Sequence, residues 1–170
     1  MSPRIASTVS IGLLAGLSCL VTAFVIKVPI WALFIAWAAV FAAGGGLDGA
    51  RRSLTMNVLG IASATLTLMA IGALGGSPWA VAGCVVVGAG VLVLITSPGV
   101  LSFTPAGFFG FASIVATVSA TGTAVTAGPS LAHPVVLVLG AVALGTGFGL
   151  ASEWLGALLT RRDHVAPQPS

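Results

Sequence analysis

Only a handful of polar or ionisable side chains lie inside the long apolar runs of this sequence. Glu153 is the one acidic residue well inside such a run, and Asn57 is the one amide. Glu153 precedes Arg161 by eight residues, about 12 Å along a helix, so it is a candidate proton relay or cation site. Its alternative roles are to reach the interface or to bond a neighbouring helix. Asn57 is a candidate solute contact, with an interhelical hydrogen bond as the alternative.

A second group of candidates surrounds a break in the apolar stretch 100–119. Pro98, Gly99 and Pro105 interrupt the chain here, which predicts a broken helix that resumes at about Ala106. Such a break leaves backbone polar groups free to bind a small neutral solute. The alternative is a proline kink that a neighbouring helix satisfies. The pathway candidates at this break are Ser102, Thr104 and Pro105. The candidates for a hydrophobic constriction are Phe34, Trp37, Phe103 and Phe108.

The remaining reactive residue types argue against several functions. Cys19 and Cys84 lie within apolar runs, and neither has the spacing of a redox or metal motif. His133 and His164 offer no metal-ligand spacing. The glycines at 44–46 lack the Gly-Lys-Ser/Thr of a phosphate-binding loop. With three acids, two histidines and no tyrosine, we expect no enzyme active site, no metal and no cofactor.

The composition is that of a membrane protein rather than of a soluble or secreted domain. Hydrophobic residues make up 58% of the 170 residues and charged residues 5%, whereas soluble domains carry about 25% charged residues. The mean hydropathy is +1.18. So few charges cannot cover a water-facing surface, and the bilayer is the expected solvent. The net charge of +3 does not come from a basic cluster, so we expect no nucleic-acid partner.

Turn-forming residues divide the chain into one membrane domain of about six helices. The first apolar run is long enough to span a bilayer, and it is too long for a signal peptide and lacks a clear cleavage site. The triple glycine at 44–46 ends the second run, and Asp48 is the expected N-cap of the third helix. The expected segments are 5–26, 30–43, 54–74, 79–95, 100–119 and 135–160, followed by a disordered cytoplasmic tail over 161–170.

The basic residues predict how these segments cross the membrane. With six crossings and a cytoplasmic N-terminus, only Lys27 falls outside, which agrees with the positive-inside rule. If segments 30–43 and 100–119 were both re-entrant, the arginine pair 51–52 would move outside, so the rule favours six crossings. We therefore expect a multi-pass inner-membrane protein with both termini in the cytoplasm. The basic residues on the cytoplasmic side are then Arg4, Arg51, Arg52, Arg161 and Arg162.

The order of the segments predicts an internal repeat. A long, a short and a long run occur over 5–74 and again over 79–160. Each half has three spans, so the second half would be inverted relative to the first. Residues 31–40 laid on 105–114 give several matches, although a chain this rich in Ala, Gly and Val produces some by chance. Inverted repeats are common in transporters and place a site near the bilayer midplane.

Two of these segments also resemble a known family. The run PIWALFIAWAAVFAAGGGLDG over 29–49 and the run LSFTPAGFFGFAS over 101–113 are similar to segments of a bacterial inner-membrane family, the domain of unknown function 1097. The similarity extends over about 5–160 in the order and spacing of the spans. It implies a small multi-pass protein of the cytoplasmic membrane. The family has no secure activity, so the resemblance assigns no functional residue.

The features together predict passage of a small solute, neutral or weakly charged, across the cytoplasmic membrane. The alternative is a membrane assembly factor or a subunit of a larger complex, which glycine-rich helix faces fit equally well. Six spans are few for a single chain to enclose a pathway, so we expect a homo-oligomer in the lipid bilayer. A continuous polar path would favour transport, and a packed interior with an exposed small-residue face would favour the alternative.

Overall fold

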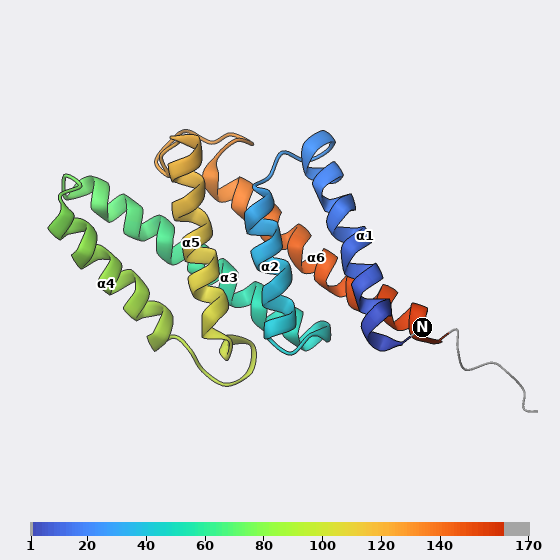
Figure 1. Ribbon diagram of the computed structural model, residues 1–170. Helices are drawn as coiled ribbons and strands as arrows, with labels where there is room; N and C mark the ends of the chain where they lie inside the picture. Colours follow the sequence, from blue (N-terminus) through green and yellow to red (C-terminus); the bar gives the residue numbers. More distant parts are fainter. Residues whose placement is uncertain (1, 162–170) are drawn as a thin grey trace, which may run out of the picture.

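The computed structural model describes residues 2–161 and, as predicted, is all-helical over that range (Figure 1). Of the predicted tail, residues 162–170 lie outside the described residues. Within residues 2–161 there are six α-helices, one short 3-10 turn and no strand. The elements are α1 (Pro3–Phe24), α2 (Ile30–Ala42), α3 (Gly46–Ala73), α4 (Pro78–Leu94), the 3-10 turn η1 (Gly99–Leu101), α5 (Thr104–Thr121) and α6 (Pro134–Arg161).

Helix α3 begins at Gly46, eight residues before the predicted start at Leu54. Gly44, Gly45 and Gly46 have positive φ angles of 104°, 71° and 61°, which glycine adopts readily and other residues do not. The chain therefore reverses directly after α2 and enters α3 at once, with Gly45 as the N-cap. The prediction that Asp48 caps this helix is wrong. Asp48 lies in the first turn, where its negative charge favours the helix dipole.

The break around Pro105 is the start of a helix. The η1 turn ends at Leu101, and α5 begins at Thr104, close to the predicted start at about Ala106. Proline is favoured in the first turn of a helix because the backbone N–H that it lacks has no intrahelical partner there. Pro105 therefore does not kink the interior of α5, and the break lies in the connection between α4 and α5, at one end of the bundle (Figure 1).

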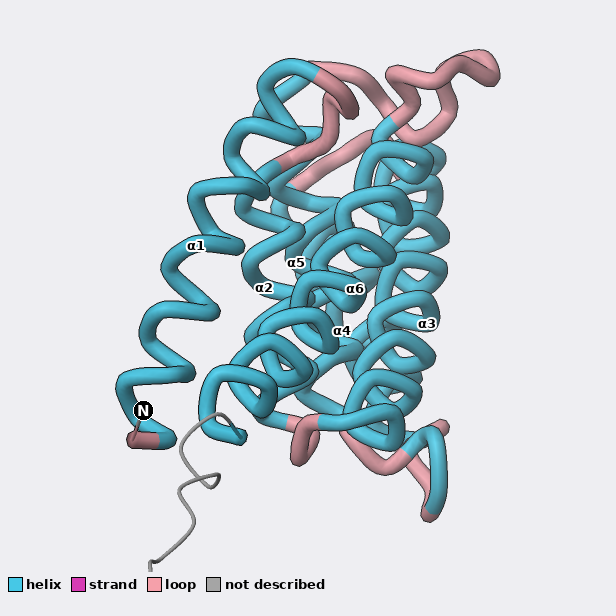
Figure 2. The backbone as a smooth tube through the Cα atoms, turned by 90° about the vertical axis from the view of Figure 1, so that its right-hand side faces the viewer, coloured by secondary structure: helices cyan, strands magenta, loops and turns pink. Residues whose placement is uncertain are grey.

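The six helices run between two ends of one bundle, where the connecting loops gather (Figure 2). The long helices α3 and α6 pack against each other, α5 packs against α3, and α2 packs against α6. Helix α1 lies along α6, and α4 lies along α3. The central apolar cluster draws on α2, α3, α5 and α6 alone, so α1 and α4 are peripheral. Its buried members are Ala36, Ile61, Ala64, Ile114, Val138 and Val142.

Four of these helices are long and apolar enough to cross a membrane: α1, α3, α5 and α6. Helices α2 and α4 are also apolar but have only 13 and 17 residues. The sequence left open whether segments 30–43 and 100–119 are re-entrant; in the structure α5 is long enough to cross, and α4 is one residue shorter than α5. The second half therefore does not repeat the long, short, long order of the first.

Corresponding helices of the two halves nevertheless pack against corresponding partners. The contact of α3 with α5 corresponds to that of α6 with α2 when the halves are exchanged, and the contact of α4 with α3 corresponds to that of α1 with α6. Gly107 of α5 packs on Gly60, and Leu33, which the sequence alignment places opposite Gly107, packs on Gly145. The inverted repeat itself stays a prediction of the sequence.

Candidate functional site

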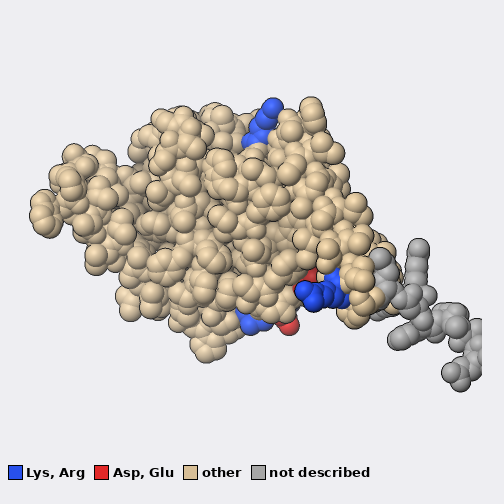
Figure 3. Space-filling view, in the orientation of Figure 1, with Lys and Arg blue, Asp and Glu red and all other residues tan. Residues whose placement is uncertain are grey.

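The charged side chains lie at the two ends of the bundle (Figure 3). One end holds the start of α1 with Arg4, the first turns of α3 with Arg51 and Arg52, and the end of α6 at Arg161. Lys27 follows α1 at the opposite end, where its Nζ donates to the carbonyl of Ala23 at 3.1 Å. We call the first of these ends the arginine end. Arg162 lies outside the described residues, and the side of the membrane that each end faces stays a prediction.

The residues predicted at the break lie at the arginine end. Ser102 is exposed and lines a hollow of about 340 Å³ together with Arg51 and Arg52. Thr104 is half-buried, and its hydroxyl lies 2.8 Å from that of Thr96, so it already has a partner. Pro105 is exposed in the first turn of α5. These positions therefore leave no unpartnered hydroxyl inside the bundle.

Asn57 lies in the interior, at the point where α3 crosses α5. It is fully buried, and its Nδ2 donates to the carbonyl of Ser53 on the same helix at 2.9 Å. A β-carbon at Gly110 of α5 would overlap the Asn57 carbonyl, and one at Gly60 would overlap the carbonyl of Gly107. The two backbones therefore touch at this crossing. The Oδ1 of Asn57 accepts no hydrogen bond in the described part of the chain.

Sequence reasoning missed a second unpartnered group beside this crossing. Ser113 is 1% exposed, and its Oγ has no hydrogen-bond partner among residues 2–161. It lies three residues after Gly110, so both are on one face of α5. Thr117, one turn further on, is also buried, and its hydroxyl donates to the carbonyl of Ser113 at 2.7 Å. The sequence did contain a signal for this group. Ser113 and Thr117 are four residues apart, as are Ser53 and Asn57 on α3, and this spacing places each pair on one face of its helix.

These residues form a buried polar stripe that passes from one helix to another. The stripe comprises Ser53 and Asn57 on α3 and Ser113 and Thr117 on α5. Both helices begin at the arginine end, and Ser53 lies nearest that end. From the level of Gly110, where Asn57 touches α5, the stripe continues seven residues along α5 to Thr117, about 10 Å. It carries no charged side chain.

The corresponding crossing of α2 with α6 is aromatic instead of polar. Trp37 stacks on Phe34 and on Phe148, with ring centroids 6.0 and 5.6 Å apart. Phe103 packs in a different cluster with Ala39, Met56 and Ala106, and Phe108 is 42% exposed. The structure therefore does not bring the four residues predicted for a constriction to one place.

Glu153 joins α6 to the start of α3. Its Oε2 accepts a hydrogen bond from the backbone N–H of Gly46 at 2.8 Å. The preceding Ser152 accepts a bond from Trp37 Nε1 at 3.1 Å on its hydroxyl and one from Ser10 Oγ at 2.6 Å on its carbonyl. These two residues thus hold α6 to all three helices of the first half. The Glu153 contact is the interhelical bond that the sequence gave as one alternative.

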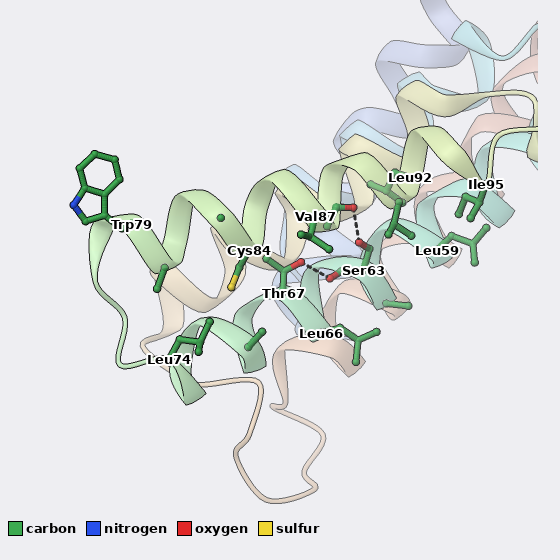
Figure 4. Close-up of a pocket in the computed structure, with 16 residues that line it drawn as sticks. Leu59, Ser63, Leu66, Thr67, Leu74, Trp79, Cys84, Val87, Leu92 and Ile95 are labelled. Carbon is green, nitrogen blue, oxygen red and sulfur yellow. Dashed lines mark hydrogen bonds between the residues drawn. The ribbon is translucent and has the colours of Figure 1, made fainter.

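A long apolar groove lies between α3 and α4 (Figure 4). Its volume is about 820 Å³. The two serine and threonine hydroxyls in it are occupied, because Ser63 donates to the carbonyl of Gly88 and Thr67 to that of Ser63, each at 2.8 Å. Trp79 stands at one end of the groove and is 88% exposed. The groove therefore presents an almost wholly apolar surface.

The remaining titratable residues do not gather into a site. No group of three His, Cys, Asp or Glu side chains lies together in the part of the chain that the structure describes. His133 contacts its own loop, where Nε2 lies 3.2 Å from the carbonyl of Val125 and Nδ1 accepts from the N–H of Val135. Cys19 is exposed and Cys84 half-buried, and both are free thiols. His164 lies outside the described residues.

An all-helical bundle with four helices that can cross a membrane defines the class as a multi-pass membrane protein. A family model described as "Protein of unknown function (DUF1097)" matches residues 8–157. The chain belongs to this family. No curated protein and no solved structure matches it.

Proposed function

We propose that this protein passes a small uncharged solute across the cytoplasmic membrane along the polar stripe between α3 and α5. The observation that carries the proposal is the pair of buried, unpartnered oxygens, Asn57 Oδ1 and Ser113 Oγ. Leaving a buried polar group without a hydrogen bond costs about 1–3 kcal/mol. Groups of this kind in a membrane protein are expensive and are functional candidates by default. A passing solute that donates hydrogen bonds would relieve this cost.

The chemistry of the stripe favours a neutral solute. An amide carbonyl accepts a hydrogen bond, and a serine hydroxyl both donates and accepts. No charged side chain belongs to the stripe, so a bare ion would have no counter-charge to offset its desolvation. Because the backbones of α3 and α5 touch at Gly60 and Gly110, the two helices must move apart at the crossing for a solute to pass.

Flux through proteoliposomes tests this proposal. Stopped-flow light scattering would follow water, a small amide, a small polyol and a monovalent salt, with empty liposomes as the baseline. We expect flux of at least one neutral solute and none of the salt. The variant Asn57→Leu keeps the side-chain shape and removes the amide, so flux should fall by about tenfold. Protein that is folded by circular dichroism but passes no neutral solute would contradict the proposal.

The rival function is a non-transporting membrane component, and one observation favours it. Gly12 and Gly16 on α1, and Gly83 and Gly90 on α4, have open space where a side chain would be. Small residues on peripheral helices let another helix approach closely. The same faces suit a homo-oligomer, which we also propose and which native mass spectrometry of the purified protein would detect. A stable complex with a different membrane protein, together with zero flux, would favour the rival.

A further inference from the structure

We propose that the groove between α3 and α4 and the hollow at the arginine end together bind one anionic phospholipid. The headgroup would lie in the hollow against Arg51 and Arg52, and one acyl chain would lie in the groove. This site is separate from the polar stripe and does not depend on the function proposed above.

The groove has the length and surface that an acyl chain requires. Leu59 and Ile95 line one end, and Leu74 and Trp79 line the other (Figure 4). Along α3 this is fifteen residues, about 22 Å, which exceeds the depth of one leaflet, about 15 Å of hydrocarbon. The hydroxyls of Ser63 and Thr67 are bonded internally, so the groove offers no free polar group. An occupant must therefore be apolar where it touches the groove.

The arginine end of the groove supplies the charge. The hollow of about 340 Å³ is lined by Arg51, Arg52 and Asp48 of α3 and by Gly99, Val100 and Ser102. Arg51 contacts Asp48 only loosely, at 3.9 Å, and its side chain is 69% exposed. Two arginines against one aspartate leave a net positive hollow. Basic pockets beside membrane-spanning helices are a known way of holding acidic lipid headgroups.

The same two segments of chain form both parts, so one molecule can occupy them together. On α3, Arg52 and Leu59 are seven residues apart and lie on one face. On the other side, Ile95 ends the groove, and Gly99 enters the hollow four residues later. A headgroup beside Arg52 therefore directs its acyl chain toward Leu59 and into the groove. Neither a free phosphate nor a fatty chain alone would use both parts.

The test measures binding of phosphatidylglycerol and phosphatidylcholine to the delipidated full chain by native mass spectrometry. We expect one phosphatidylglycerol per chain, bound at least tenfold more tightly than phosphatidylcholine. A juxtamembrane arginine contributes about five-fold, so Arg51→Gln with Arg52→Gln should weaken phosphatidylglycerol about 25-fold. Lys27→Gln, which removes the cation at the opposite end, is the matched control and should change the affinity less than twofold. Glycerol phosphate, the headgroup without acyl chains, should bind at least tenfold more weakly than the intact lipid.

A second pair of variants tests the groove. Val91 lines the part of the groove nearest the arginine end and is 42% exposed, so Val91→Trp fills the part that an acyl chain from that end would occupy. We expect a loss of affinity of at least tenfold. Val86 is on the same helix, is exposed and does not line the groove, so Val86→Trp is the matched control. Both variants are first checked for folding by circular dichroism, with Val91→Phe as the smaller filler.

Three results would overturn the proposal. Equal affinity for the two lipids would show that the arginines do not select an anionic headgroup. Unchanged affinity in folded Val91→Trp or Val91→Phe would mean that the lipid is attracted to surface charge alone. A dimer that resists lipid and dissociates in Val91→Trp would mean that a second copy of the chain covers the groove.

Discussion

At the scale of single residues, Gly110 sets how closely α5 approaches α3. A β-carbon at this position would overlap the backbone of Asn57, and backbone cannot rotate away as a flexible side chain can. The glycine therefore permits the contact that buries Asn57 and brings Ser113 one turn above it. A substitution at this position tests the crossing directly.

Gly110→Ala should lower the free energy of unfolding by about 1–3 kcal/mol, the usual cost of overpacking a tight interior. Thermal unfolding in detergent, followed by circular dichroism, would measure the change. Gly12→Ala is the control, because Gly12 has open space around it and alanine favours helix. A Gly110→Ala protein as stable as Gly12→Ala would show that the backbones of α3 and α5 do not touch at Gly110.

Glu153 is the second residue whose role is tested by substitution. Its carboxylate caps the N-terminus of α3 through the N–H of Gly46, and loss of a cap costs about 1 kcal/mol. Glu153→Ala should therefore lower the melting temperature measurably, while Glu153→Gln, which keeps an acceptor oxygen, should lower it less. Equal effects of the two variants would argue against the cap.

At the scale of elements, the two crossings differ in chemistry although their packing partners correspond. Helices α3 and α5 meet through glycines and small polar residues, whereas α2 and α6 meet through Trp37 and Phe148. The Trp37 ring also donates to the hydroxyl of Ser152 on α6. The α2–α6 pair is therefore held by both stacked rings and a buried hydrogen bond. We expect this pair to stay fixed when α3 and α5 move apart.

Trp37→Phe should destabilise the protein by about 1–2 kcal/mol, because it removes a buried hydrogen bond and leaves the Ser152 hydroxyl short of a donor. Trp79→Phe is the control, since Trp79 is 88% exposed and its replacement should change little. Unfolding of both variants under one set of conditions gives the comparison. A larger effect at Trp79 would mean that this ring is covered in the folded protein, for example by another chain.

The sequence predicted the elements well, because lipid-spanning helices are long apolar runs separated by glycine and proline. It missed helix ends that depend on glycine conformation. Asp48 fitted an N-cap by residue type, but the three positive φ angles at Gly44–Gly46 start α3 earlier. At Pro105 the sequence predicted a break with a helix that resumes at about Ala106, and α5 begins at Thr104. In both places the residue types correctly indicated the start of a helix, and the backbone geometry decided at which residue the helix begins.

At the scale of the whole molecule, the candidate site depends on which helices cross. Asn57 stood out in the sequence because it is the one asparagine in an apolar run. Ser113 did not, because serine is unremarkable in helices of this kind, and only the α3–α5 contact makes it a neighbour of Asn57. The sequence could not show how Ser102 and Thr104 lie relative to Asn57 for the same reason, and the structure places these two residues at the arginine end of the bundle.

The most direct test of a polar route between α3 and α5 is the chemical accessibility of the stripe in proteoliposomes. In a chain with Cys19→Ser and Cys84→Ser, single cysteines replace Ser113, Thr117 and, as the control, Thr146. Thr146 is also a buried hydroxyl, but it lies on α6 and bonds its own helix. We expect a small water-soluble thiol reagent to modify Ser113→Cys and Thr117→Cys and to leave Thr146→Cys unmodified. Protection of both stripe positions in folded protein, or equal reaction at all three, would contradict a polar route between α3 and α5.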